Sequence, residues 1–474
     1  MARIGGAHQG QGLLMTAAYS LPSTATRESS SRFFDELRAT EYGRLDKDDQ
    51  AYLDYTGSGL YAERQITSHS RRLRGCVLGN PHSENGPSLH STALINETRT
   101  KLLRFLDASP QEYAVIFVAN TSAAIKLVAE SFPFDGETPL VLSADNHNSM
   151  NGVREFARAK GAAVHYIPLD EELRRQGARA LLVGSRSPIG GLFGVPAQSN
   201  FSGVKHPLAL INDAHRLGYM VLLDAAAFLP TNRISLSRYH PDFLALSIYK
   251  ITGYPTGVGA LVARRESLKK LRRPWFAGGT VEYASVQHGT HLLADRVEGF
   301  EDGTPAFIDI AAVADGLSLL EEIGVDRISA HVARHAARFM SELSMMRRRD
   351  GSKLVRIYGP LDSVNRGATI AFNVISRTGN VVPFARVVER ARNEGVSLRG
   401  GCFCNPGASE AAFDFPKDAT RMCLQEAARC GFTIDKFSAC VGPAIPVGAV
   451  RASMGIATNE RDVDRALAIV ASFD

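Results

Sequence analysis

Two cysteines stand two positions apart in the stretch GGCFCNPG, residues 400–407. Cys402 and Cys404 could bind a metal, form a disulfide, act as a nucleophile with a bystander, or have no special role. A metal site needs further ligands, and no adjacent histidine or second close cysteine pair is present, so we expect no metal here. A nucleophile must be a thiolate, which nearby basic groups such as Arg399 favour. The flanking glycines are typical of a loop that moves a thiol onto a bound substrate.

A lysine and an aspartate each follow an apolar run that predicts a buried strand. Lys250 comes shortly after FLALS, residues 243–247, and Asp224 closes the run MVLL, residues 220–223. A Schiff-base lysine needs a desolvated, partly deprotonated amine, which the end of a strand above a pocket provides. Lys250 is therefore a candidate for covalent chemistry, and the alternative is an ordinary surface lysine.

Polar residues follow two further apolar runs. The stretch FVANTSAAIK places Asn120, Thr121 and Ser122 where a strand turns into a helix, and His147 follows the run LVLS, residues 140–143. Hydroxyls and free N–H groups at a helix start favour a phosphate, although an ordinary helix cap has the same composition. An acid, a lysine, a phosphate cradle and an imidazole at one sheet edge are what pyridoxal phosphate needs.

The elements that would position these residues alternate along the chain. Apolar runs predict strands buried on both faces, and helix-like segments separate several of them. We expect strands at residues 114–118, 140–143, 180–183, 220–223 and 243–247, and helices at residues 122–132, 149–161 and 207–218. The alternation predicts an α/β fold with a mostly parallel sheet wrapped by helices, whose ligands bind at the carboxyl ends of the strands.

The chain is expected to divide into three parts. These are an N-terminal arm, partly disordered, over residues 1–45, a large domain over residues 46–305, and a smaller α+β domain over residues 306–474 that carries the cysteine loop. A long helical stretch, residues 308–345, would lead out of the large domain, and residues 367–376 predict a strand of the small one. Because no low-complexity linker separates them, we expect the two domains to pack tightly.

Composition restricts the possible partners. The chain has 474 residues and a net charge of +5 at pH 7, and its basic runs are short and dispersed, so we expect no nucleic-acid partner. No apolar stretch of about 18 residues is present to span a membrane. Six cysteines in so long a chain make no disulfide framework. We expect a soluble protein of the cytoplasm, where thiols stay reduced.

Nine stretches of the chain resemble, in the same order, stretches of the class V, fold-type I pyridoxal-phosphate enzymes. Among these, the chain is most similar to cysteine desulfurases, and closest to the N-terminal desulfurase-like domain of molybdenum cofactor sulfurases. The resemblance covers about residues 45–470 and is most specific in PAQSNFSG and GCFCNPG. The stretches are YLDYTGSGLY, GNPHSENGPS, DNHNSM, PAQSNFSGVKHPL, SIYKITGYPTG, FAGGTV, FEDGTP, LRGGCFCNPGA and GAVRAS.

The resemblance implies which residues hold the cofactor. Lys250 would be the Schiff-base lysine, and Asp224 the partner of the pyridinium nitrogen. Asn200 matches a residue near the ring hydroxyl. His147 best fits the imidazole stacked on the ring, with Asn146, one position away, as the alternative. The residues that match phosphate-binding positions are Thr121, Ser122, Ser247 and, from a neighbouring subunit, Thr304.

The resemblance also implies substrate-binding and reactive residues. Arg399 and Arg451 match the arginines that hold the substrate carboxylate, which a bidentate guanidinium fits well. In the pattern R-x-G-x-x-C, Cys404 takes the nucleophile's position, and Cys402 takes one that other desulfurases fill with residues other than cysteine. The chain departs from the family at three positions, which are Ala227 for a common glutamine, Tyr249 for a histidine, and Ser409 for a third cysteine.

These roles imply a desulfurase that takes sulfur from L-cysteine, leaves a persulfide on Cys404 and releases alanine, with Lys250 also moving the α-proton. The alternative is a carbon–sulfur lyase acting on cysteine or a cysteine conjugate, which would release pyruvate and not need Cys404. The expected partners are a sulfur-acceptor protein or a small thiol, and a second copy of the chain in a homodimer. We expect the C-terminal MOSC domain of full-length sulfurases to be absent, so the acceptor stays open.

Overall fold

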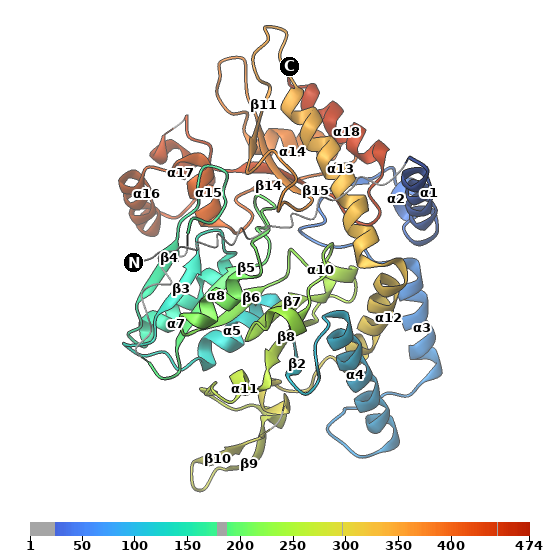
Figure 1. Cartoon of the computed structure of the whole chain (residues 1–474), viewed down its shortest axis with the longest axis vertical. Helices are drawn as coiled ribbons and strands as arrows, with labels where there is room; N and C mark the ends of the chain where they lie inside the picture. The colour runs from blue at the N-terminus through green and yellow to red at the C-terminus, as the bar shows by residue number, and fades with distance from the viewer. Residues whose placement is uncertain (1–23, 178–186, 296, 443) are drawn as a thin grey trace, which may run out of the picture.

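A seven-stranded sheet is the largest layer of the structure, a computed structural model that describes residues 24–177, 187–295, 297–442 and 444–474, with side chains from residue 31 (Figure 1). Its strand order is β2-β8-β7-β6-β5-β3-β4. The strand β8 runs antiparallel to β2 and β7, and the other neighbours pair in parallel. The strands are β2 (Tyr113–Val118), β3 (Leu140–Ser143), β4 (Val164–Ile167), β5 (Gly191–Pro196), β6 (Tyr219–Asp224), β7 (Phe243–Ser247) and β8 (Gly259–Arg264).

Both faces of this sheet are buried under helices. In β2, Val115 and Phe117 belong to one apolar cluster and Ala114 and Ile116 to the other, as the two-residue period of a strand requires. One face packs on α5 (Thr121–Ser131) and α7 (Val153–Ala159), and the other on α4 (Gly86–Phe105), α8 (Leu210–Arg216) and α12 (Phe307–Ile323). The predicted α/β fold with a mostly parallel sheet is confirmed.

The sequence predicted some of these strands and missed others. The strands at residues 114–118, 140–143, 220–223 and 243–247 are present, whereas the one expected at residues 180–183 lies outside the described residues. The strands β4, β5 and β8 were not predicted. In β5 the glycines and the proline interrupt the apolar run, and β8 follows a stretch punctuated by glycine and proline. Their strand character depends on neighbours far away in the sequence.

The C-terminal domain holds an antiparallel sheet of order β11-β12-β15-β14. Its strands are β11 (Val355–Tyr358), β12 (Thr369–Val374), β15 (Ala449–Ser453) and β14 (Arg399–Gly401), packed with α13 (Val325–Met345), α14 (Phe384–Asn393) and α18 (Glu460–Ala471). The long helical stretch expected over residues 308–345 is present as two helices, α12 and α13. The break falls at Gly324, whose φ of 88° is unfavourable for other residues.

Three helices lie between β14 and β15, namely α15 (Pro406–Phe413), α16 (Lys417–Cys430) and α17 (Ile434–Val441). The last two pack together and are joined by a disulfide between Cys423 and Cys440. We had expected no disulfide framework and a reduced set of cysteines, and this bond corrects that expectation for one pair. A spacing of 17 residues does not reveal the pairing, because only the packing of α16 on α17 brings the two sulfurs together.

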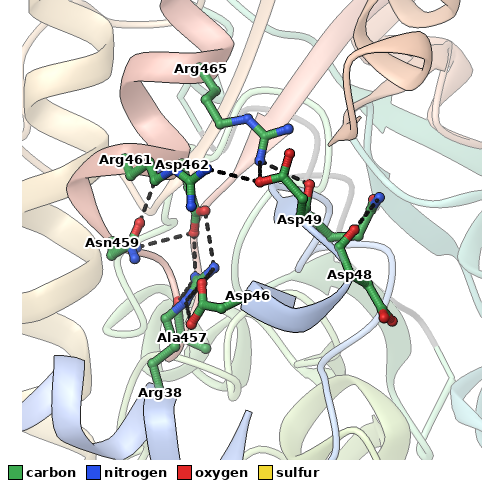
Figure 2. A network of polar contacts seen from close by, with 10 residues as sticks. Arg38, Asp46, Asp48, Asp49, Ala457, Asn459, Arg461, Asp462 and Arg465 are labelled. Atoms are coloured by element: carbon green, nitrogen blue, oxygen red, sulfur yellow. Dashed lines mark hydrogen bonds and ion pairs between the residues drawn. The ribbon is translucent and has the colours of Figure 1, made fainter. Parts of the chain in front are cut away.

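The N-terminal segment packs against the C-terminal domain. It forms α1 (Thr24–Glu41), α2 (Arg44–Lys47) and β1 (Ala51–Tyr52), and β1 pairs in parallel with β13 (Val396–Ser397). Figure 2 shows the buried Arg38 side chain donating to Asp462 at 2.6 Å and to the Ala457 carbonyl at 2.5 Å, with Asp46 beside it. The described part of the expected arm is thus helical, and Arg38 packs against the C-terminal domain. Residues before and after the expected boundary at 45/46 contact that same domain.

In the described part of the chain, no helix has both the length and the apolar character needed to cross a bilayer.

Candidate active site

Lys250 lies on α10 (Ile248–Thr252), the short helix that directly follows β7. Its side chain is half-buried. Burial lowers the pKa of the amine, the charge of Asp224 opposes this shift, and the charges of Arg451 and Arg399 add to it. A lowered pKa increases the fraction of neutral amine, which is the form that attacks a carbonyl.

Asp224 and His147 lie at or just after the ends of two other strands, and both interact electrostatically with Lys250. Asp224 closes β6, is 8% exposed and accepts a 2.9 Å hydrogen bond from the Ala226 N–H. His147 caps the helix α6 (Asn148–Asn151), and its Nδ1 accepts a 3.1 Å hydrogen bond from the Ser149 N–H, which leaves Nε2 to carry the proton of the neutral ring. Burial lowers the pKa of His147, while the charge of Asp224 raises it. Both groups therefore lie within electrostatic reach of Lys250.

Asn146, the alternative to His147, points elsewhere. It is fully buried, and its Nδ2 donates 2.9 Å hydrogen bonds to the carbonyl oxygens of Ser143 and Gly194. Its amide therefore holds the loop after β3 against β5. The imidazole of His147 is the side chain that faces the charged groups, and its stacking on a cofactor ring stays a prediction.

Hydroxyl groups gather at the N-terminus of α5. Thr121 Oγ1 lies 2.7 Å from Ser247 Oγ, which also accepts a 2.8 Å hydrogen bond from the Thr121 N–H. Ser122 Oγ lies 2.5 Å from Ser149 Oγ, and Asn120 caps the helix with its side chain. The structure thus brings together the three predicted phosphate-binding residues of this chain. It adds Ser149, which lies in the quoted stretch DNHNSM but was not singled out.

The two cysteines of the loop have different surroundings. Cys402 is half-buried, its thiol donates a 3.2 Å hydrogen bond to the Val447 carbonyl, and burial raises its pKa. Cys404 is a free, exposed thiol. Its charge bears on the pKa of both Lys250 and Arg399. Of the two, Cys404 is the exposed thiol and the one whose charge acts on the pKa of the lysine.

The cysteine loop is tied down on several sides. Phe403 and Cys404 have φ values of 56° and 54°, which are costly for residues with a side chain and persist only where contacts hold them. Here the Asn148 N–H donates to the Cys404 carbonyl and Asn200 Nδ2 to the Phe403 carbonyl, both at 2.7 Å. The guanidinium of Arg451 lies 4.6 Å from the centre of the Phe403 ring. These contacts hold the loop in the conformation seen here, and its movement onto a bound substrate stays a prediction.

Asn200, expected beside a ring hydroxyl, is thereby part of the loop's support. Besides its bond to Phe403, its Oδ1 accepts a 2.9 Å hydrogen bond from Asn405, whose amide also donates to the Asp145 carbonyl at 2.7 Å. Asn405 caps α15 and follows the cysteine directly. Sequence reasoning missed this role of Asn405 and Asn200, because the contacts join segments about 200 residues apart in the chain.

The two predicted substrate-binding arginines, Arg399 and Arg451, both donate hydrogen bonds to the carboxylate of Asp54. Arg399 and Arg451 are direct cross-strand partners in β14 and β15. Arg399 Nε donates to both Asp54 oxygens at 3.0 and 2.9 Å, and Arg451 donates to Asp54 at 3.0 Å and to the Asn200 carbonyl at 2.9 Å. The predicted pair is thus assembled, and Asp54, within the quoted stretch YLDYTGSGLY, is the member that sequence reasoning missed.

Thr304 belongs to a different neighbourhood. Its side chain is exposed and accepts a 3.4 Å hydrogen bond from the exposed Asn80. The segments around these two residues, GNPHSENGPS and FEDGTP, also border FAGGTV, because a Cβ at Gly279 would lie 2.8 Å from the His82 ring. Three of the resembling stretches therefore meet here, and the described contacts of Thr304 do not include the hydroxyls at α5.

The fold is that of fold-type I enzymes. The structure is similar to that of a cysteine desulfurase from Thermococcus onnurineus NA1, with a TM-score of 0.75, 23% identity, and coverage of 92% of this chain and 97% of that one. It is also similar to the cystine C–S lyase C-DES, with a TM-score of 0.66 and 17% identity, over 90% of this chain and 98% of that one. The fold is therefore common to enzymes of both kinds.

Sequence comparison gives the family. Residues 51–466 match the aminotransferase class-V family, and the chain belongs to it. It is 35% identical over 461 residues to the molybdenum cofactor sulfurase of Bos taurus, which covers 92% of this chain and 51% of that protein. The sulfurase of Solanum lycopersicum is 34% identical over 413 residues, which is 80% of this chain and 50% of that protein. The chain thus spans about half the length of these curated relatives.

The residues present fit pyridoxal phosphate. The hydroxyls and N–H groups at the start of α5 suit a phosphate. In this structure they form hydrogen bonds with one another, and a bound anion would accept hydrogen bonds from the same groups. A lysine of lowered pKa suits the aldehyde, and a buried carboxylate at the end of β6 suits a protonated ring nitrogen. Among the described residues, no cluster of three or more histidine, cysteine, aspartate or glutamate side chains is placed to hold a metal ion.

Proposed function

We propose that this protein is a pyridoxal-phosphate-dependent cysteine desulfurase that takes sulfur from L-cysteine, forms a persulfide on Cys404 and releases L-alanine. The observation that carries the proposal is the free, exposed thiol of Cys404 within electrostatic reach of Lys250. A lyase would need the lysine and the cofactor-binding groups, but it would not need a thiol held at this place.

Each residue of the site has a task in this reaction. Pyridoxal phosphate, when bound, supplies an electron sink for the negative charge left at the α-carbon of an amino acid. Lys250 would hold the aldehyde of the cofactor and would take the α-proton of the substrate as a general base, which its lowered pKa favours. Asp224 would pair with the ring nitrogen, and His147 would contribute an imidazole to the same site. Arg399 and Arg451 hold the substrate carboxylate.

Cys404 then receives the sulfur. Its thiolate attacks the substrate sulfur, so that a bond forms between the two sulfurs and the substrate's carbon–sulfur bond breaks. The electron pair of the broken bond stays on carbon, which is protonated to give the methyl group of alanine. The substrate carbon is reduced and the two sulfurs share the oxidation as a persulfide, so no outside oxidant is needed.

The products of L-cysteine test this proposal. Steady-state assays should find alanine and little pyruvate, with the sulfur recovered from the protein or from an added thiol. Pyruvate and ammonia as main products would make the protein a carbon–sulfur lyase, the reaction that the relative C-DES is named for.

We propose that the persulfide passes to a separate sulfur-acceptor protein or a small thiol, and that this happens in the cytoplasm, where Cys404 stays reduced. The curated relatives are named for sulfuration of the molybdenum cofactor. Added dithiothreitol should raise turnover, because it removes the sulfur that would otherwise stay on Cys404. Turnover that is independent of added thiol would contradict this step.

We also propose a homodimer with a shared site. Thr304 and Asn80 are exposed, and so are the side chains of Trp275 and Phe276, at 48% and 42%. A second subunit would cover these aromatic groups and bring Thr304 to its cofactor phosphate. Sedimentation of the active protein should give a dimer. A monomer with full activity at assay concentration would exclude it.

A further inference from the structure

Asp54 is placed between two positive charges that the strand register forces together. Arg399 and Arg451 are direct partners across the β14–β15 pair, and like charges at such positions repel each other. The Asp54 carboxylate accepts from Nε of Arg399 at 3.0 and 2.9 Å and from Arg451 at 3.0 Å, and is 9% exposed. It reaches this place because Asp54 bridges to Ser453, two residues after Arg451.

One carboxylate does not saturate this pair. Two guanidinium groups and one carboxylate leave a net charge of +1. The Nε of the buried Arg451 has no hydrogen-bond partner among the residues that the structure describes, and the side chain of Arg399 is 49% exposed. Both arginines also act on the pKa of Lys250. A group with one spare positive charge and an unpaired donor suits one further carboxylate.

We infer that Asp54 is the positioning residue of the substrate-carboxylate site. It ties the half-exposed Arg399 to the buried Arg451, so that their free donors are already oriented when an amino acid enters. It also cancels one of the two positive charges, so that the site accepts one monocarboxylate and the lysine is not exposed to two uncompensated cations. The inference rests on the proposed function in one respect, which is that the substrate is an α-amino acid.

The packing around Asp54 decides which substitution tests this role. A Cβ at Gly57 would lie 2.7 and 2.9 Å from the Asp54 oxygens and 2.6 Å from Arg399, so there is no space for a longer side chain. Asp54→Asn keeps the shape and removes the charge. The double variant Asp54→Asn with Arg399→Gln returns the net charge to +1 without restoring the clamp. Asp315→Asn, which breaks an ion pair with Arg72, is the matched control.

The experiment measures binding of L-alanine to the cofactor-loaded protein from the change in the cofactor's visible absorption. Alanine has no sulfur to transfer, so the result does not depend on whether the protein is a desulfurase or a lyase. Asp54→Asn should weaken alanine binding about tenfold or more, because Arg399 is no longer held in place. Asp315→Asn should bind as the wild type does.

A second readout separates positioning from general damage to the fold. In Asp54→Asn the pKa seen in the pH dependence of the cofactor's absorption should fall, since two uncompensated cations disfavour a proton near Lys250. The double variant should restore this pKa but not alanine binding. Unchanged or tighter alanine binding in Asp54→Asn, at normal cofactor content and thermal stability, would overturn the inference, and so would an unchanged pKa.

Discussion

Cys404 is exposed and its charge acts on the pKa of Lys250 and Arg399, whereas Cys402, two residues away, is half-buried and its thiol donates to a carbonyl. Ser409 lies beside Cys402, and its hydrogen bond offsets part of the rise in pKa that burial causes. At the scale of single residues, the roles of the two thiols are therefore set by burial and by which polar groups lie within reach.

Cys404→Ser should abolish alanine formation and keep the cofactor spectrum together with its change on adding cysteine. The reason is that a serine hydroxyl does not attack sulfur, while the groups that hold the cofactor and the amino acid are untouched. The product assay with L-cysteine and the visible spectrum measure the two effects separately.

Cys402→Ser is the matched control and should keep most activity, because its thiol has a raised pKa and an internal partner. Mass spectrometry after cysteine treatment without reductant should place the added sulfur on Cys404. Loss of alanine in Cys402→Ser alone would reverse the two roles.

At the scale of elements, the site is made by strand ends. The strands β2, β3, β6 and β7 run in the same direction, and the segments that follow them carry Thr121, His147, Asp224 and Lys250. The carboxyl ends of strands that run in the same direction meet at one edge, so residues far apart in sequence become neighbours. Because β8 is antiparallel to both β7 and β2, β2 runs in the same direction as β7. The start of α5, which follows β2, therefore lies at the same edge of the sheet.

The N-terminal segment depends on one buried ion pair, visible in Figure 2. Arg38→Met should lower the free energy of unfolding by about 3–5 kcal/mol, because it leaves the carboxylate of Asp462 buried without its partner. Burial already raises the pKa of Asp462, and the charge of Arg38 counters that rise. Urea unfolding at neutral pH measures the loss.

Asp46→Asn is the control for this pair, since the Asp46 side chain is 48% exposed and a pair at such a position contributes about 1 kcal/mol or less. If Arg38→Met unfolded within about 1 kcal/mol of the wild type, the segment would not depend on this ion pair.

At the scale of the whole molecule, the site draws its residues from the two large sheets and from the segment that follows β1. Lys250 and Asp224 come from the large sheet, Cys404 and Arg451 from the C-terminal domain, and Asp54 from the segment after β1. The N-terminal and C-terminal parts of the chain are thus packed together near the site. Their packing also buries His331 and His335 on α13, beside a cavity of about 210 Å³ that Asp35 and Glu460 also line.

The stability of the whole chain should fall as pH is lowered from about 6.5 toward 4. Burial lowers the pKa of His331 to about 3 and of His335 to about 4, from the ordinary 6.5, and the nearby Arg334 adds to both shifts. Between these values the unfolded chain binds protons that the folded one does not, so protonation favours unfolding. Urea midpoints between pH 7.5 and 4.5 measure the slope.

His335→Gln should flatten this slope, whereas the same change at the exposed His288, in the turn of the hairpin β9 (Val281–Ser285) and β10 (Thr290–Leu293), serves as the control. Equal slopes in the two variants would show that acid sensitivity arises elsewhere.

The sequence by itself determined the features that depend on local pattern. Apolar runs followed by polar residues identified the ends of β2, β3, β6 and β7, and with them Thr121, His147, Asp224 and Lys250. A strand buried on both faces needs a continuous apolar run, and a helix that starts beside a ligand needs polar residues at its first turn. Both requirements are met within a few neighbouring residues, so they can be read from a short stretch.

The tertiary structure alone decided the features that depend on distant partners. It placed Asp54 between Arg399 and Arg451, tied Asn200 to the cysteine loop, paired Cys423 with Cys440, and made strands of β4, β5 and β8. Each of these depends on strand register or helix packing between remote segments, and the residues themselves are compatible with other partners. The free energy that selects one partner comes from burial and charge compensation, which exist only once the chain is folded.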